Sequence, residues 1–136
     1  MLNRHSETGL LDIIGDLGIG CIAFSGLAQG LLTDKYVSGD TAPGRATQDG
    51  TFKKNFLSKE NLKNVRGLAA IAKNRGQTLA QMAIAWVLRD ARVTSALIGA
   101  RTVAQLDDSL DALKQLEFSR RRAAKSRAGS SGKYCD

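Results

Sequence analysis

The stretch Gly18–Lys35, GIGCIAFSGLAQGLLTDK, decides the fold class, because an apolar run breaks there into a polar, glycine-containing loop. Residues 19–24 (IGCIAF) carry no charge and no polar alternation, which is typical of a strand covered on both faces in a parallel α/β sheet. The loop that follows offers backbone amides and small polar side chains, from Ser25, Gly26, Gln29, Gly30 and Lys35. Such a loop can bind a phosphate group, although an ordinary strand-to-helix connection shows the same pattern.

A second junction of this kind lies near the other end of the chain. Residues 94–98 (TSALI) read as a strand, and Gly99, Arg101 and Thr102 lead from it into a helical pattern that begins at Val103. A helix N-terminus next to a basic residue favours anions. The sequence therefore predicts a second anion site.

Both junctions resemble motifs of the aldo-keto reductase family. Residues 24–36, FSGLAQGLLTDKY, resemble the family's FSPLAQGLLTGKY segment, and residues 98–113, IGARTVAQLDDSLDAL, resemble the IGA-x-x-x-x-QL-x-x-N-x-x-AL segment that closes its nucleotide site. The resemblance is strongest to the subgroup with bacterial L-glyceraldehyde 3-phosphate reductases and potassium-channel beta subunits. It covers residues 1–118 and only the C-terminal part of the family barrel.

The resemblance implies an α/β fold, namely the C-terminal part of a (β/α)8 TIM barrel. A complete barrel needs about 250 residues, so a chain of 136 is expected to be an incomplete barrel with the last two βα units and a long loop, residues 36–57, that covers the cofactor. Residues 1–118 would form the NADP-binding half. An altered reading frame would explain why the family pattern stops after Phe118, and we state it as a hypothesis.

Local signals predict the helices of this half. A short helix follows Ser6 and presents an apolar stripe, Leu10, Leu11, Ile13, Ile14 and Leu17, toward the next strand, and Gly18 ends it. Ser58 is the expected N-cap of a second helix that ends at Gly76. Thr78 and Gln81 form a capping box for a third helix, in which Trp86 stands at core spacing.

The cofactor-binding positions follow from the resemblance, residue by residue. Phe24 matches the aromatic residue that stacks on the nicotinamide ring, with a core phenylalanine as the alternative. The positions along the pyrophosphate are Ser25, Leu27, Gln29 and Lys35. Arg45 matches a loop arginine that reaches a cofactor phosphate, unless it is simply solvated. Gly99, Arg101, Gln105 and Asp108 match positions around the adenosine and its 2′-phosphate.

Several details qualify this cofactor site. Arg101 favours NADP (NADPH) over NAD, because a guanidinium can pair with the extra phosphate. Gln105 has a second interpretation, since Thr102-x-x-Gln105 is itself a capping box. Gly26 stands where the family has proline, Asp34 where it has glycine, and Ser109 where it has asparagine. A looser loop and an added negative charge are both expected to weaken cofactor binding.

Net charge is concentrated at the C-terminal end of the chain. The whole chain carries +7, and residues 119–136 hold six basic residues against one acidic residue, which leaves +2 for residues 1–118. We expect this basic tail to be disordered, because it is rich in Ser, Gly and Arg and has no apolar periodicity. A nucleic-acid or membrane-surface arm is the alternative. No specific nucleic acid and no membrane are expected as partners.

The chain has no apolar run long enough to span a membrane, and we expect a cytoplasmic protein. Cys21 and Cys135 are far apart and lack metal-ligand spacing, so neither a disulfide nor a metal site is predicted. His5, the only histidine, is expected at the surface. The two strands are expected to be neighbours with open barrel edges, which favours self-association.

No catalytic residue is assigned. Family members reduce carbonyls by hydride transfer from the nicotinamide, while a tyrosine, assisted by lysine, histidine and aspartate, protonates the oxygen; these residues lie on earlier strands. Tyr36 and Tyr134 stand at non-matching positions. The resemblance thus implies an oxidoreductase of small aldehydes, with this chain inactive alone. The alternative is a non-catalytic nucleotide-binding or interaction protein with a basic tail.

Overall fold

The computed structural model describes residues 1–2, 4–34, 37 and 58–118. Its helices are α1 (Leu10–Asp16), α2 (Lys59–Asn74), α3 (Leu79–Leu88) and α4 (Val103–Asp111), and its strands are β1 (Cys21–Ala23) and β2 (Val93–Ala96). Short 3-10 turns occur at η1 (His5–Glu7), η2 (Ala28–Gly30) and η5 (Ala112–Lys114). The expected cofactor-covering loop, with Lys35 and Arg45, and the basic tail lie outside the described residues.

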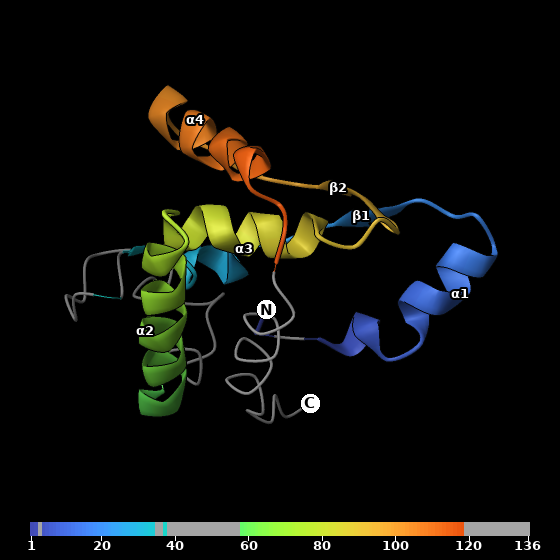
Figure 1. Ribbon diagram of the computed structural model, residues 1–136, viewed down its shortest axis with the longest axis horizontal. Helices are drawn as coiled ribbons and strands as arrows, with labels where there is room; N and C mark the ends of the chain where they lie inside the picture. Colours follow the sequence, from blue (N-terminus) through green and yellow to red (C-terminus); the bar gives the residue numbers. More distant parts are fainter. Residues whose placement is uncertain (3, 35–36, 38–57, 119–136) are drawn as a thin grey trace.

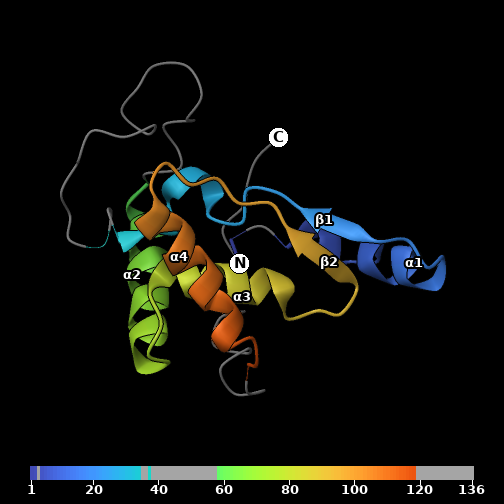
Figure 2. The same ribbon diagram turned by 90° about the horizontal axis from the view of Figure 1, so that it is seen from above.

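β1 and β2 form a parallel two-stranded sheet. The chain leaves β1, passes through α2 and α3 and returns to β2, so the strands are direct neighbours, as expected from the sequence (Figure 1). α3 contacts β2, and α4 packs on α3 beside the sheet (Figure 2). Two parallel strands, each followed by helices, are compatible with part of a (β/α)8 barrel.

The register of the sheet contains one irregularity. Cys21 pairs with Val93 and Ile22 with Ser95, so Thr94 is an extra residue of β2. Its Oγ1 accepts a hydrogen bond of 3.2 Å from the Cys21 N–H. Beyond this β-bulge, Ala23 pairs with Ala96, and the Leu97 N–H donates to the Ala23 carbonyl at 2.8 Å.

The expectation that the first strand is covered on both faces is wrong. The side chain of Ile22 is 67% exposed and that of Phe24, just after the strand, is 77% exposed, whereas Cys21 and Ala23 are half-buried. β1 is also shorter than the apolar run 19–24, because only three residues pair with β2. The uncharged run correctly indicated a parallel sheet, but among the described residues only one face of that sheet is packed.

The core lies among α2, α3 and the segment after β1. Its buried members include Leu31, Leu32, Val65, Leu79 and Met82. α2 begins at the Ser58 cap, where the Asn61 N–H donates to the Ser58 hydroxyl, and Gly76, at φ +70°, follows its end. Thr78 and Gln81 form the predicted capping box, so the local signals for both helices are confirmed.

Trp86 is the centre of a second cluster at the end of α3. Its side chain is 2% exposed, which confirms the predicted core position. The Arg89 guanidinium carbon lies 3.8 Å from the indole centroid, and the Phe118 ring meets the indole edge-on at a centroid distance of 5.1 Å. Arg75 stacks 3.9 Å over Phe118 and donates to the Glu117 and Gln115 carbonyls. These contacts hold the chain that leaves α4 against α3.

α1 differs from its prediction. It begins at Leu10 after Gly9, which has φ +104°, and His5–Glu7 form a separate 3-10 turn. Of the expected apolar stripe only Leu11 is buried, whereas Leu10, Ile13 and Leu17 are exposed. The C-terminal stop is confirmed, because Gly18 has φ +66° and the Ile19 N–H donates back to the Ile14 carbonyl. His5 is exposed, as expected.

Substitution of Leu31 by alanine should destabilise the protein by about 2–5 kcal/mol, because Leu31 is fully buried in the core cluster. Ile22→Ala is the matched control on the open face of the sheet and should change the free energy of unfolding by less than about 0.5 kcal/mol. Urea denaturation of both variants measures the difference. Equal destabilisation by the two substitutions would contradict the assignment of Leu31 to the core and of Ile22 to an exposed face of the sheet.

Candidate functional site

The candidate site lies where β1 and β2 end. The strands are parallel and directly paired, so the residues that follow them, Phe24–Ser25 and Gly99–Arg101, lie at the same edge of the sheet. In α/β sheets this edge is the usual position of ligands. Both predicted anion junctions are therefore brought to one edge.

The loop after β1 has an unusual backbone. Ser25, Ala28 and Gln29 adopt positive φ values of 56°, 47° and 56° although none is glycine. Each such residue costs about 1–2 kcal/mol relative to a right-handed conformation, and strain of this kind is concentrated at functional sites. The sequence carried no signal for these conformations, because the glycines of the segment suggest other positions for positive φ.

Two amides of this loop are already engaged. The Ala28 N–H donates to the Ser25 carbonyl at 2.8 Å, and the Gly30 N–H donates to the Leu27 carbonyl at 3.0 Å. They are therefore not available to a phosphate. The side chains of Ser25 and Gln29 are exposed, and Leu27 is half-buried against the core. A phosphate could still be contacted by the side chains of Ser25 and Gln29 and by the remaining amides of the loop, such as that of Gly26.

A cavity of about 370 Å³ opens beside the end of β1. Its wall includes Phe24, Ser25 and Gln29 from the candidate site, Cys21 of β1 and Trp86 of α3. Three of the predicted cofactor-binding residues thus line one hollow. Gly99, Arg101, Gln105 and Asp108, which follow β2 in the sequence, do not line this cavity.

The turn after β2 is held by Gln105. Its Oε1 accepts a hydrogen bond of 2.9 Å from the Arg101 N–H, and its own N–H donates to the Thr102 hydroxyl at 3.2 Å. This is a variant of the capping-box alternative, in which the glutamine reaches Arg101 instead of Thr102. Arg101 is exposed, and the hydrogen bond leaves its guanidinium free to take part in anion binding.

Asp108 and Ser109 face the interior of the chain. The Asp108 carboxylate accepts hydrogen bonds from Gln81 Nε2 at 2.7 Å and from the Thr78 hydroxyl at 3.3 Å, which ties α4 to the start of α3. Ser109 is buried and its hydroxyl donates to the Gln105 carbonyl. In this arrangement Asp108 supports α4 directly, and a contact with adenosine stays a prediction.

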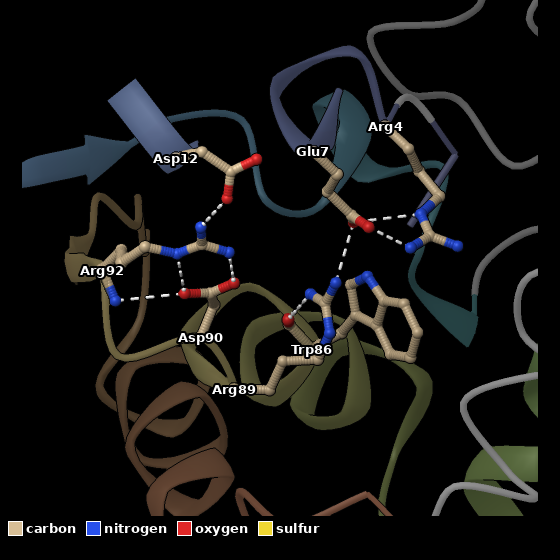
Figure 3. Close-up of polar contacts among 7 residues, drawn as sticks. All are labelled: Arg4, Glu7, Asp12, Trp86, Arg89, Asp90 and Arg92. Atoms are coloured by element: carbon tan, nitrogen blue, oxygen red, sulfur yellow. Dashed lines mark hydrogen bonds and ion pairs between the residues drawn. The ribbon is translucent and has the colours of Figure 1, made fainter. Parts of the chain in front are cut away.

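An ion-pair network was not found from the sequence, and three of its members, Glu7, Arg89 and Asp90, line the same cavity as Phe24 and Ser25. Arg92 donates to both oxygens of Asp90 at 2.8 Å and also pairs with Asp12 of α1 (Figure 3). Glu7 pairs with Arg4 and, at 2.8 Å, with Arg89 (Figure 3). The network joins the N-terminal segment to the end of α3 and the start of β2. Arg4–Glu7 and Asp90–Arg92 are local pairs, but Arg89–Glu7 and Arg92–Asp12 join residues 82 and 80 positions apart, which no local motif marks.

These contacts shift the pKa values of Asp90, Glu7 and Arg92. The hydrogen bonds from Arg92 lower the pKa of Asp90 to about 2. Burial on its own raises the pKa of Glu7, but the hydrogen bonds from Arg4 and Arg89 outweigh it, and the net shift is downward. Asp90 pairing in turn raises the pKa of Arg92. These shifts favour the charged forms of Glu7, Asp90 and Arg92 at neutral pH.

The comparisons with known proteins identify the family. The model of the aldo/keto reductase family matches residues 1–128, and the chain belongs to this family. L-glyceraldehyde 3-phosphate reductase of Escherichia coli K12 is 44% identical over 129 residues, which cover 91% of this chain and 37% of that protein. Protein tas of Escherichia coli K12 is 37% identical over 120 residues, covering 88% of this chain and 34% of that protein.

A third relative is the uncharacterized oxidoreductase YrpG of Bacillus subtilis 168, which is 33% identical over 114 residues, covering 84% of this chain and 33% of that protein. The chain thus spans about a third of the length of the curated relatives it matches.

No helix in the described part of the chain is long and apolar enough to cross a membrane. Those residues also contain no group of three or more His, Cys, Asp or Glu side chains that could hold a metal ion.

Acid should weaken the fold through Asp90. Its pKa is lower in the folded chain than in the unfolded chain, so its stabilising contribution is present above about pH 4 and is lost as the pH falls toward 2. Because the pair is partly exposed, we expect a contribution of about 1 kcal/mol. Asp90→Asn should remove this part of the pH dependence in thermal unfolding.

Asp16→Asn, at an exposed position at the end of α1, is the matched control and should behave like the wild type. The same loss of stability between pH 4 and pH 2 in Asp90→Asn and in the wild type would contradict the assignment to Asp90.

Proposed function

We propose that this chain forms the nucleotide-binding part of an NADPH-dependent oxidoreductase that acts on small aldehydes such as glyceraldehyde 3-phosphate. The observation that carries the proposal is the meeting of an exposed aromatic ring, Phe24, and an exposed basic turn, Gly99–Arg101, at one edge of a parallel sheet. Membership in the aldo/keto reductase family and the names of two relatives, a reductase and an oxidoreductase, support the reaction class.

The residues present fit a dinucleotide. Phe24 offers an uncovered ring face at the strand end, suitable for stacking on a nicotinamide, and Ser25 and Gln29 offer polar side chains beside it. Arg101 can pair with a 2′-phosphate, which distinguishes NADP from NAD. NADPH would supply a hydride when bound; the residues of this chain bind and orient it. Two features oppose tight binding, the exposed carboxylate of Asp34 and the engaged amides of the loop.

We propose that this chain does not supply the proton donor for carbonyl reduction. General-acid assistance is worth about 10²–10⁴ in rate, and we assign no such group to any residue of the chain. Tyr36 and Tyr134 both lie outside the described residues. In this proposal the chain binds nucleotide but does not reduce aldehydes by itself.

Arg101→Ala should weaken NADPH binding by about 1.5–3 kcal/mol and leave NADH binding almost unchanged, because only NADPH carries the 2′-phosphate. The matched control is Arg66→Ala, which removes an exposed arginine from α2. Titrations that follow the fluorescence of Trp86, the only tryptophan of the chain, measure both affinities. Equal affinity of the wild type for the two nucleotides would remove the assignment to Arg101.

Purified chain should show no NADPH-dependent reduction of glyceraldehyde above background, even at nucleotide concentrations that saturate the binding site. The assay follows NADPH absorbance, and a mock purification from the same host controls for contaminating reductases. Sustained turnover that is lost in Phe24→Ala would show that the chain does supply a proton donor.

A further inference from the structure

We propose that Thr94 is a positioning residue, whose hydroxyl holds the β-bulge that sets the two halves of the candidate site in register. The expected effect on nucleotide binding rests on the proposed function, because it requires that Phe24–Ser25 and Gly99–Arg101 contact the same nucleotide. Thr94 itself lies at the opposite end of the short sheet, next to Cys21. Thr94 is not one of the cofactor-binding positions that the resemblance to the family implies.

The two strands use different numbers of residues over the same stretch of the sheet. Between the pairs Cys21–Val93 and Ile22–Ser95, β1 advances by one residue and β2 by two. Thr94 is the residue left over. Bulges bend a strand and re-aim the side chains beyond them, and they are common next to active sites.

A side-chain contact satisfies the bulge. Where two strands lose a regular ladder bond, an amide loses its carbonyl partner. Here the Thr94 Oγ1 accepts the Cys21 N–H at 3.2 Å, so the side chain supplies the acceptor for the Cys21 amide at the bulge. Such a bond makes the irregular register a specified state of the sheet.

Gly20 makes room for this hydroxyl. A Cβ on Gly20 would lie 2.9 Å from the Thr94 Oγ1, closer than side-chain contacts normally allow. Gly20 does not have a positive φ, so its backbone conformation is open to other residues. The absence of a side chain at this position is therefore explained by the approach of Thr94 rather than by the backbone.

The consequence appears at the other end of the strands. With the bulge, Ala23 pairs with Ala96, and the Leu97 N–H donates to the Ala23 carbonyl. Without it, Ala23 would pair with Ser95, and the two strand ends would shift against each other by one residue, about 3.3 Å. A nucleotide that contacts both Phe24 and Arg101 would no longer fit, since hydrogen bonds tolerate only a few tenths of an ångström.

The experiment compares four variants of the full chain. Thr94→Val removes the hydroxyl at nearly constant shape, Gly20→Ala crowds it, Thr94→Ser retains it, and Ser95→Ala removes the neighbouring exposed hydroxyl as the matched control. Amide hydrogen exchange of Cys21 reports the bulge directly. Cross-strand nuclear Overhauser contacts of Ala23, with Ala96 or with Ser95, report the register, and NADPH titration reports its consequence.

We expect Cys21 exchange to accelerate about threefold to tenfold in Thr94→Val and Gly20→Ala, as the loss of one hydrogen bond predicts. The contacts of Ala23 should move toward Ser95 in these variants, and NADPH affinity should fall about tenfold or more. Thr94→Ser and Ser95→Ala should behave like the wild type in all three measurements.

Unchanged Cys21 exchange and unchanged Ala23 contacts in both Thr94→Val and Gly20→Ala would overturn the role of Thr94. A shifted register with unchanged NADPH affinity would overturn the positioning of the site. A wild-type chain that binds no nucleotide would instead refute the proposed function, and the exchange and contact measurements would still decide whether Thr94 sets the register.

Discussion

The parallel pairing of β1 with β2 is the constraint on which the rest of the structure depends. Cys21 and Thr94 are 73 residues apart in the sequence, yet the pairing places their strands side by side and both strand ends at one edge. α3 packs under β2 and fixes its position, and α4 is tied to α3 through Asp108 and Gln81. The pairing of the strands therefore sets the positions of the candidate site residues, and the helices hold the sheet in place.

The two faces of this sheet differ sharply. One lies over α3 and the buried Trp86 cluster, and the other exposes Ile22, with Phe24 and Leu97 exposed just beyond the strands. α4 likewise exposes an apolar row, Val103, Leu106 and Leu110. Apolar surface of this extent is unusual for a protein that stands alone. It agrees with a chain that spans about a third of the length of its relatives; self-association through open edges stays a prediction.

Local signals in the sequence were sufficient for much of the fold. The Ser58 cap, the Thr78–Gln81 capping box and the Gly18 stop act within a few residues, so the helices could be predicted from short motifs. The parallel sheet followed from the uncharged run 19–24, but its open face did not, because exposure depends on what else packs against the strand. The Arg89–Glu7 and Arg92–Asp12 pairs were missed for the same reason, since their partners are brought together only by tertiary structure.

In the candidate site, too, some features could be predicted from sequence motifs and others could not. Phe24, Ser25 and Gln29 were predicted from a motif, and they line one cavity, whereas the positive φ values of Ser25, Ala28 and Gln29 had no signal in the residue types. Gln105 illustrates an ambiguity that the sequence left open. Its side chain holds the turn at Arg101, so its contribution to a nucleotide site would be to fix a backbone rather than to touch the ligand.

Amide chemical-shift mapping with NADP⁺ tests whether both junctions belong to one nucleotide site. We expect the perturbed amides to form two groups in the sequence, residues 24–29 and residues 99–105, and both groups to titrate with a single dissociation constant. Perturbation of only one group, two different dissociation constants, or no perturbation at millimolar nucleotide would contradict it.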